Sequence, residues 1–402
     1  MKYLFAFFVL MSNILSTHAG PKLLPGEWRA DLAINDTMVL PFNFTVEGTR
    51  LTIRNSDEKI QVDEITYSND SVIIRLPVFD AEIRAAIVSE FLVGDFINHA
   101  RKTKNILSFR AMHNASFRFS EHPAPPSIQV SGKWKVVFDN EDPESKIAVG
   151  VFKQSGNHLT GTFLTTTGDY RFLEGEVNGN SISLSTFNGA HLFLFTAQMG
   201  KDKQLHGHFY SGSHWHDTWS ASRDSTVELA DPESLTSINP GSPPFDFTFP
   251  DENGTPVSLH DARFKNKVVL VELMGTWCPN CLDETWFLAQ LYKENKPAGL
   301  EVVGLSYEKS TDTNLVRNNI LRLKNRTGAE YPILFAGSND KTEAAKTLPA
   351  LNRVWAYPTT IFIDRKGTVR RIHTGFSGPA TGEEYEKLTQ RIKDFTAKLL
   401  SE

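Results

Sequence analysis

The stretch VVLVELMGTWCPNC, residues 268–281, decides how the rest of the chain is read. It opens with an apolar run, the composition of a strand that is buried on both faces. After a turn at Gly275 comes Cys278, followed by Pro279, which suits the first position of a helix because its missing N–H would have no partner there. Cys281 completes a C-x-x-C motif. We therefore expect a strand, a short turn and a helix, with Cys278 at the helix N-terminus and Cys281 one turn further on.

This placement favours redox chemistry at the two cysteines. The free N–H groups and the dipole of a helix N-terminus stabilise the thiolate of Cys278, and a thiolate is the attacking form in thiol–disulfide exchange. Cys281 would lie close enough to attack the resulting mixed disulfide and release the product. A structural disulfide over so short a loop would constrain little of the unfolded chain, and a zinc site would need further ligands close by. We predict a redox-active pair with no other cofactor, formed by the only two cysteines of the chain.

The sequence resembles the thioredoxin superfamily, and more closely its TlpA/ResA-like thiol–disulfide oxidoreductases of bacterial envelopes. The likeness rests on GTWCPNC (residues 275–281) and YPTTIFID (residues 357–364), and it covers the chain from about Pro243 to the end. It implies that Pro358 is cis and packs beside the cysteines. It also implies a disulfide reductase, with disulfide-containing envelope proteins as substrates and a membrane-bound electron donor.

Two glutamates are candidates for proton transfer. Glu272, six residues before Cys278, falls where thioredoxins carry a buried Asp that shuttles a proton for the second cysteine. A charged side chain in a buried strand is unfavourable unless it titrates or pairs, and the alternative is a wet strand end with a lysine partner. Glu284, three residues after Cys281, matches an acidic residue common in the ResA-like branch. A glutamate is also common in the first turns of a helix for dipole reasons alone.

Residues around the cysteines and the proline are expected to form the substrate groove. Trp277 precedes the attacking cysteine and should partly cover it, although a tryptophan of the core is the alternative. Pro358 is expected to be cis in spite of the ordinary frequency of about 5% for such bonds. The predicted substrate-binding residues are Trp277, Pro279, Tyr357 and Thr359.

The chain of 402 residues is longer than one domain usually is. Its N-terminal half has short alternating segments between turn signals, which is typical of an all-β region. Because meandering strands must close or pack to hide their edges, we expect either two small barrels or one sandwich. A duplication is indicated by segments that recur in the same order: 26–29 with 132–135, 46–52 with 154–160, 69–73 with 179–183, and 92–96 with 205–209.

The predicted fold is therefore multi-domain, an all-β region followed by an α/β thioredoxin-like domain. Alternating β and α patterns follow a linker rich in proline. We expect strands at 300–307, 331–335, 358–364 and 368–373, and helices at 311–327, 341–348 and 382–400. The predicted divisions are a signal peptide (1–19), two β-rich copies (20–126 and 127–227), a linker (228–242) and the redox domain (243–402).

The N-terminus predicts export. Residues 1–19 have an early lysine, an apolar run and a small-residue end, which together are typical of a cleaved signal peptide. An uncleaved membrane anchor is the alternative, but the apolar run is short for a bilayer span. We expect an exported protein of the periplasm or cell envelope, a compartment in which disulfides form. The net charge of −5 argues against nucleic acid as a partner.

Four histidines close together in the sequence are candidates for a metal site. His206 and His208, and His214 and His216, are spaced by two, so each pair would share one face of a strand. A hairpin could bring all four together as a zinc or copper site. We expect instead that they form a solvent face and bind no metal, opposite a core face of Leu205, Phe209, Trp215 and Trp219.

Two alternative functions stay open. Peroxiredoxins share the fold but carry a threonine three residues before the reactive cysteine, after a proline. Here Thr276 lies two residues before Cys278, and that proline is missing. The second alternative is a module in which the β-rich region binds an unknown ligand and the redox domain regulates it.

Overall fold

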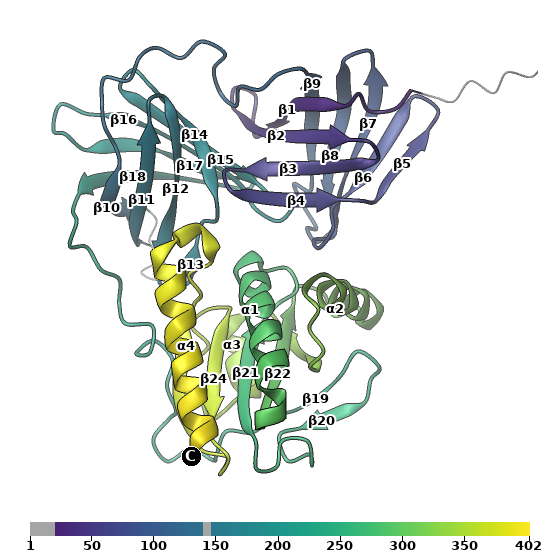
Figure 1. Cartoon of the computed structure of the whole chain (residues 1–402), viewed down its shortest axis with the longest axis vertical. Helices are drawn as coiled ribbons and strands as arrows, with labels where there is room; N and C mark the ends of the chain where they lie inside the picture. The colour runs from purple at the N-terminus through teal and green to yellow at the C-terminus, as the bar shows by residue number, and fades with distance from the viewer. Residues whose placement is uncertain (1–20, 140–145) are drawn as a thin grey trace, which may run out of the picture.

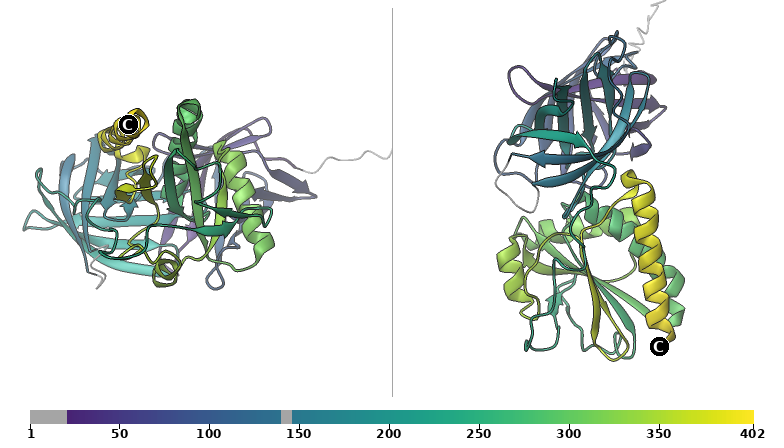
Figure 2. Two further views of the ribbon diagram at one scale, coloured as in Figure 1. Left: turned by 90° about the horizontal axis from the view of Figure 1, so that it is seen from below. Right: turned by 90° about the vertical axis from the view of Figure 1, so that its left-hand side faces the viewer.

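The computed structural model describes residues 21–139 and 146–402, so the predicted signal peptide lies outside the described residues. Figure 1 shows two curled β-sheets side by side at one end of the molecule and an α/β body at the other. In the right-hand view of Figure 2, the sheets stand above the α/β body. Within those two described ranges, no helix is long and apolar enough to cross a membrane.

The first sheet is an antiparallel meander that curls back on itself. Its strands are β1 (Gly26–Ala33), β2 (Val39–Glu47), β3 (Arg50–Asn55), β4 (Glu58–Val62), β5 (Ile65–Ser68), β6 (Ser71–Arg75), β7 (Ala81–Val88), β8 (Phe91–Asn98) and β9 (Ile106–His113). β1 pairs with both β2 and β9, so the first and last strands lie together. The two edge strands, β4 and β5, are neighbours in the chain, so the sheet is a barrel open along one seam.

The second sheet closes completely. Its strands are β10 (Gly132–Phe138), β11 (Ile147–Ser155), β12 (His158–Thr165), β13 (Gly168–Asp169), β14 (Leu173–Asn178), β15 (Ser181–Phe187), β16 (Leu192–Met199), β17 (Leu205–Ser211) and β18 (Trp215–Arg223). β10 pairs with β18, and β11 pairs with β12, which makes a ring. β13 branches from β12 outside that ring. Closure leaves no strand edge in the ring, and of the two predicted arrangements the barrels, not the sandwich, are correct.

The two barrels repeat the same local devices. The indole of Trp28 donates to the carbonyl of Leu24 at 3.0 Å, and the indole of Trp134 donates to that of Val130 at 2.8 Å. A Cβ at Gly94 would lie 2.0 Å from a backbone oxygen of the neighbouring strand, and a Cβ at Gly207 would lie 1.9 Å from one. These equivalent positions support the predicted duplication.

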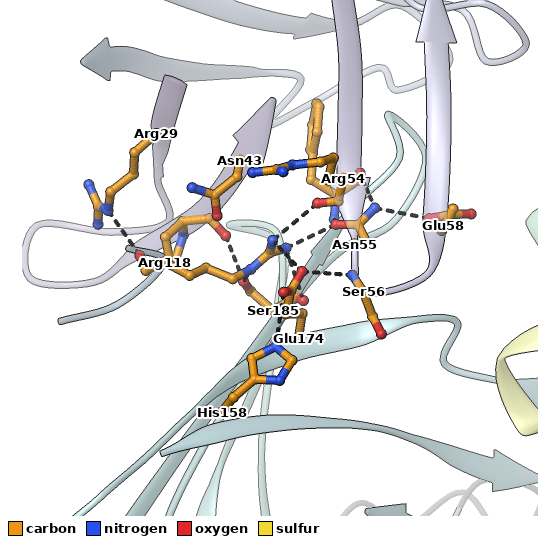
Figure 3. Close-up of polar contacts among 12 residues, drawn as sticks. Arg29, Asn43, Arg54, Asn55, Ser56, Glu58, Arg118, His158, Glu174 and Ser185 are labelled. Atoms are coloured by element: carbon orange, nitrogen blue, oxygen red, sulfur yellow. Dashed lines mark hydrogen bonds and ion pairs between the residues drawn. The ribbon is translucent and has the colours of Figure 1, made fainter. Parts of the chain in front are cut away.

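The junction of the barrels buries one arginine and one phenylalanine. Phe187, at the end of β15, stacks on Phe42 of the first barrel with ring centroids 4.2 Å apart. Figure 3 shows Arg118 donating to Asn55 at 2.9 Å and to Glu174 at 3.4 Å. Burial lowers the pKa of Arg118 to about 10, an effect that the nearby Glu174 carboxylate opposes. The first barrel is therefore fastened to the wall of the second by both ring stacking and a paired buried charge.

The α/β body has the thioredoxin arrangement. Its sheet runs β23-β22-β21-β24-β25, in which β23, β22 and β21 are parallel to one another and β24 is antiparallel to both of its neighbours, β21 and β25. Every residue of the central strand β21 is buried, as predicted for this apolar run. The elements are β19 (Thr248–Pro250), β20 (Pro256–Ser258), β21 (Val268–Met274), α1 (Pro279–Asn295), η1 (Lys296–Ala298), β22 (Leu300–Glu308), α2 (Thr313–Thr327), β23 (Ile333–Ser338), α3 (Lys341–Thr347), β24 (Thr359–Ile363), β25 (Val369–Thr374), η2 (Pro379–Thr381) and α4 (Glu383–Ser401).

The predicted linker lies against the redox domain rather than spanning open solvent. Ile238 forms an antiparallel bridge with Leu351, and the N–H of Asn239 donates to the carbonyl of Ala350 at 2.8 Å. Upstream, the N–H of Thr374 donates to the carbonyl of Pro232 at 3.1 Å. A fragment that begins at residue 243 would lose these contacts.

Candidate active site

The C-x-x-C motif sits where β21 turns into α1. Cys278 is the N-cap of α1, its Sγ accepts from the N–H of Cys281 at 3.2 Å, and Pro279 occupies the first turn. The two cysteines form a disulfide in this structure. Cys278 is 7% exposed and Cys281 is fully buried, so Cys278 is the sulfur that a second molecule reaches first. The predicted strand, turn and helix are confirmed.

Trp277 forms one side of the approach to Cys278. Its indole N–H donates to the carbonyl of Tyr307 at 2.9 Å, and its ring meets that of Tyr357 edge-on at 6.0 Å. The ammonium of Lys309 lies 4.6 Å from the centre of the Trp277 ring, and burial lowers the pKa of this lysine to about 8. The ring is only half-buried and therefore belongs to the approach rather than to the core.

Glu308 holds the turn before Trp277, a role that the sequence analysis missed. Its carboxylate accepts from the N–H of Thr276 at 2.9 Å and from the Thr276 hydroxyl at 2.8 Å. Burial raises the pKa of Glu308, although these hydrogen bonds oppose the shift. A glutamate at the end of a strand carries no motif, so only the folded structure reveals this contact.

Pro358 has the predicted cis bond to Tyr357. The carbonyl oxygen of Tyr357 lies 3.6 Å from Sγ of Cys278, which places this loop directly beside the motif. Thr359 is different from the other predicted groove residues. Its side chain is fully buried, and its hydroxyl donates to the carbonyl of Ala356 at 2.8 Å, so it lies outside the lining of the cleft described below.

Glu272 and Glu284 are both fully buried. The Thr285 hydroxyl donates to Glu272 at 3.0 Å, and the Thr360 hydroxyl donates to Glu284 at 2.8 Å. Burial raises the pKa of Glu272 well above its usual value, and the charge of Glu284 raises it further. Burial also raises the pKa of Glu284 to about 8. The alternative of a wet strand end with a lysine partner is wrong for Glu272, whose partners are the hydroxyls of Thr285 and Tyr331.

The two carboxyls belong to the region behind Cys281. Glu284 and Thr285 follow Cys281 on α1 by three and four residues, so they share its face of the helix. Glu272 reaches the same place from β21, since it is bonded to Thr285 and lies opposite Thr360 in the sheet register. Carboxyls whose pKa values lie near or above neutrality can take up and release protons under ordinary conditions.

The second barrel covers the motif, which no sequence signal indicated. The side-chain amide of Asn280 donates to the carbonyl of Asp169 at 3.2 Å, and the N–H of Gly378 donates to the Asp169 carboxylate at 2.6 Å. Arg171 forms a buried ion pair with Asp283 of α1 and a second one with Glu58 of the first barrel. Contacts between residues more than a hundred positions apart, without a motif, are not readable from one sequence.

A cleft of about 460 Å³ lies between the mouth of the second barrel and the redox domain. Cys278 is among its lining residues. The redox domain contributes Trp277, Pro279, Asn280 and Tyr357, and the barrel contributes Asp169, Tyr170, His191, Phe193, Phe209, His214 and Trp215. Among the predicted substrate-binding residues, Trp277, Pro279 and Tyr357 are thus brought together.

The four histidines have different partners in the structure. His208 and His216 lie 3.1 Å apart, but His206 pairs with Asp202 and His214 lies 3.0 Å from Arg101. No group of three or more metal-ligating side chains occurs in residues 21–139 and 146–402. The expected core face is also only partly correct. Trp215 is 50% exposed at the barrel rim, whereas the other expected core residues, Leu205, Phe209 and Trp219, are buried.

The fold and the cysteine pair define a thioredoxin-like thiol–disulfide oxidoreductase. Residues 240–372 match the model of the AhpC/TSA family. The chain is 28% identical to the thiol-disulfide oxidoreductase ResA of Bacillus subtilis (strain 168), over 38% of this chain and 76% of that protein. It is 29% identical to the thiol:disulfide interchange protein DsbE of Vibrio cholerae serotype O1, over 40% and 83%.

A third relative, the thioredoxin-like protein YneN of Bacillus subtilis (strain 168), is 33% identical over 34% of this chain and 73% of that protein. The chain belongs to the thioredoxin superfamily, in its ResA-like branch of thiol–disulfide oxidoreductases, with an additional N-terminal region of two barrels. These three relatives match at most two-fifths of the chain.

Proposed function

We propose that this enzyme is an exported reductase of protein disulfides. The observation that carries the proposal is the position of Cys278, which caps α1 beside the Tyr357–Pro358 loop and opens to a cleft, while Cys281 is buried behind it. This asymmetry supplies one attacking and one resolving sulfur. The relatives named as thiol–disulfide oxidoreductases support the same reaction class.

The reaction proceeds in two exchanges from the dithiol form. The thiolate of Cys278 attacks one sulfur of the substrate disulfide, and the other substrate sulfur leaves as a thiolate that takes up a proton. Cys281, once deprotonated, attacks Sγ of Cys278 and releases the second substrate sulfur as a thiolate. The substrate has gained two electrons, and the enzyme holds the Cys278–Cys281 disulfide seen here. A membrane-bound dithiol donor is proposed to return the enzyme to the dithiol form.

The carboxyl pair is proposed to accept the proton of Cys281 in the second exchange. A fully buried thiol cannot lose its proton to bulk water directly, so a nearby base is needed. Glu272 and Glu284 lie behind Cys281 from a strand and from its own helix. Thr285 and Thr360 fix the orientation of these two carboxyls by the hydrogen bonds given above. Pro358, Trp277, Pro279 and Tyr357 are proposed to shape the groove in which the substrate disulfide lies.

Export and localisation belong to the proposal as well. The signal-like composition of residues 1–19 supports secretion, and we propose the periplasm as the compartment in which the enzyme meets disulfide-containing envelope proteins. No cofactor other than the cysteine pair is part of the proposed reaction.

A single-turnover experiment tests the proposed function. The reduced full-length protein is mixed with a peptide held by an intermolecular disulfide, and the released thiol is quantified. One equivalent of disulfide should be reduced per protein. Cys281→Ser should accumulate a stable mixed disulfide, and Cys278→Ser should not. Turnover of hydrogen peroxide without turnover of the peptide disulfide would favour the peroxidase alternative and contradict this proposal.

A further inference from the structure

The second barrel stands opposite Cys278 across the cleft. The floor of the cleft is formed by Trp277, Cys278 and Pro279, and the opposite wall belongs to the second barrel. A substrate must therefore enter between the two parts of the chain. The cleft volume of about 460 Å³ lies within the range of ~300–1,000 Å³ that pockets for small ligands have.

The wall is fastened in place by Arg171 and by a loop of the first barrel. Arg171 is buried and joins Asp283 of the redox domain to Glu58 of the first barrel. Val78 and Phe79, from the loop between β6 and β7, are buried in the core cluster of the redox domain. These contacts come from both barrels, so the wall does not depend on a single side chain.

The lining of the cleft is largely aromatic, and it also contains one lysine, Lys341, and one aspartate, Asp169. Tyr170, Phe193, Phe209 and Trp215 of the barrel line it together with Trp277 and Tyr357. Burial lowers the pKa of His191 well below its usual value and that of His214 to about 4, so both imidazoles are neutral at pH 7. Such a lining favours flat and apolar side chains over charged ones.

We propose that the second barrel is part of the substrate-binding site, and that its mouth selects a short extended polypeptide segment with an aromatic or large aliphatic residue next to the disulfide-bonded cysteine. This inference rests on the proposed reductase function. In that complex the substrate sulfur meets Cys278 at the floor, and the neighbouring apolar side chain packs against the barrel wall. A disulfide on the flat surface of a folded domain is excluded, because the barrel rim stands between that surface and Cys278.

Trp215 is the specificity residue to test, since it is half exposed at the rim and can be shortened without opening a core. Trp286 of α1 is a matched control, because it is 38% exposed and does not line the cleft. Two disulfide peptides of equal length are used with the full-length protein, one with tryptophan and one with glycine beside the cysteine. The kcat/KM of the wild type should be about tenfold higher for the tryptophan peptide. Trp215→Ala should remove most of this ratio, and Trp286→Ala should leave it as in the wild type.

A second pair of measurements tests whether the barrel keeps folded substrates away from Cys278. The wild type should reduce a folded protein with a surface disulfide far more slowly than the tryptophan peptide. Arg171→Met leaves the carboxylates of Asp283 and Glu58 without their cation, so it should loosen the wall and raise the rate with the folded protein relative to the peptide.

The outcomes separate the two proposals. Equal kcat/KM values for both peptides and for the folded protein would overturn the substrate class and leave the reductase function intact. The proposed substrate class would also be overturned if Trp215→Ala and Trp286→Ala changed the ratio of the two peptide kcat/KM values by the same factor. Failure of the wild type to reduce any of the three disulfides would overturn the reductase function, and the substrate class with it.

Discussion

Arg118 at the barrel junction and Glu272 in the redox domain are both buried ionisable side chains, but their surroundings differ. Arg118 donates to Ser185, Asn55, Arg54 and Glu174, so its charge is fully solvated by the protein. Among the described residues, the hydrogen-bond partners of Glu272 are the hydroxyls of Thr285 and Tyr331, and a second carboxyl, that of Glu284, is its neighbour. Arg118 therefore keeps its positive charge at ordinary pH values, whereas the carboxyl of Glu272 can take up or release a proton.

The comparison separates structural from chemical use of buried polarity. A buried charge with complete hydrogen bonding and a counter-ion fixes geometry, and its loss is felt as instability. A buried carboxyl with a raised pKa and no cation is a candidate for proton transfer, and its loss is felt as slower chemistry. Substitutions at Arg118 should therefore change the stability of the protein, and substitutions at Glu272 should change the rate of the reaction.

The largest effect is expected at the cysteine that faces the cleft. Cys278→Ser removes the attacking thiolate, so turnover of any disulfide should fall by several orders of magnitude, to the uncatalysed rate. The thermal transition should remain cooperative because the site lies at the surface of its domain. Stopped-flow or thiol-release assays measure the loss. Residual turnover above one-tenth of the wild type would contradict the assignment of Cys278 as the attacking sulfur.

Arg171→Met should be the most destabilising single substitution at the interface of the barrel and the redox domain. It leaves Asp283 and Glu58 without the cation, and breaking a buried pair from one side costs about 3–5 kcal/mol. Denaturant unfolding followed by fluorescence measures this change. Arg263→Met, at a more exposed arginine whose nearest carboxylate lies 4.0 Å away, is the control and should change stability by at most about 0.5 kcal/mol. Equal stability of the two variants would show that the ion pairs of Arg171 do not stabilise the folded protein.

Glu272→Gln should mainly affect the second exchange. The amide cannot accept the proton of Cys281, so resolution should slow by about a hundredfold while the first attack by Cys278 is preserved. Mixed disulfide should then accumulate during turnover, which non-reducing gels or mass spectrometry detect. Glu294→Gln, on the exposed part of α1, is the control. If Glu272→Gln resolves its mixed disulfide as fast as this control, the proton-transfer role is wrong.

Much of the redox domain could be predicted because its signals are local. An apolar run, a proline at the first helical position and a C-x-x-C motif report on neighbouring residues, and β21 and α1 begin where these signals place them. α2 begins at Thr313, two residues after its predicted start, because the carboxylate of Asp312 caps the backbone N–H groups of Asn314 and Leu315.

The relation between the barrels and the site could not be predicted. Asp169 and Arg171 are ordinary residues of a β-rich segment until folding brings them against Asn280 and Asp283. Trp215 was expected in the core from its alternation, yet it lies at the end of a strand where the barrel wall stops, so half of its side chain is exposed. Contacts of this kind depend on how whole domains dock, and periodicity within one strand carries no information about docking.

The last expected effect is a pH dependence of stability that Glu284 contributes. In the unfolded chain this carboxyl titrates near its ordinary value of 4.5, and burial raises its pKa to about 8 in the folded protein. Between these values the folded state holds a proton that the unfolded state has released. The stabilising contribution is therefore complete below about pH 4.5 and is lost as the pH rises through about 8, with a slope of at most about 1.4 kcal/mol per pH unit.

Glu284→Gln does not titrate, so the difference in unfolding free energy between the wild type and this variant should change steadily from pH 5 to pH 8. Denaturant unfolding of the oxidised proteins at four pH values measures the difference, and curves that run parallel over this range would mean that Glu284 is ionised in the folded protein at neutral pH.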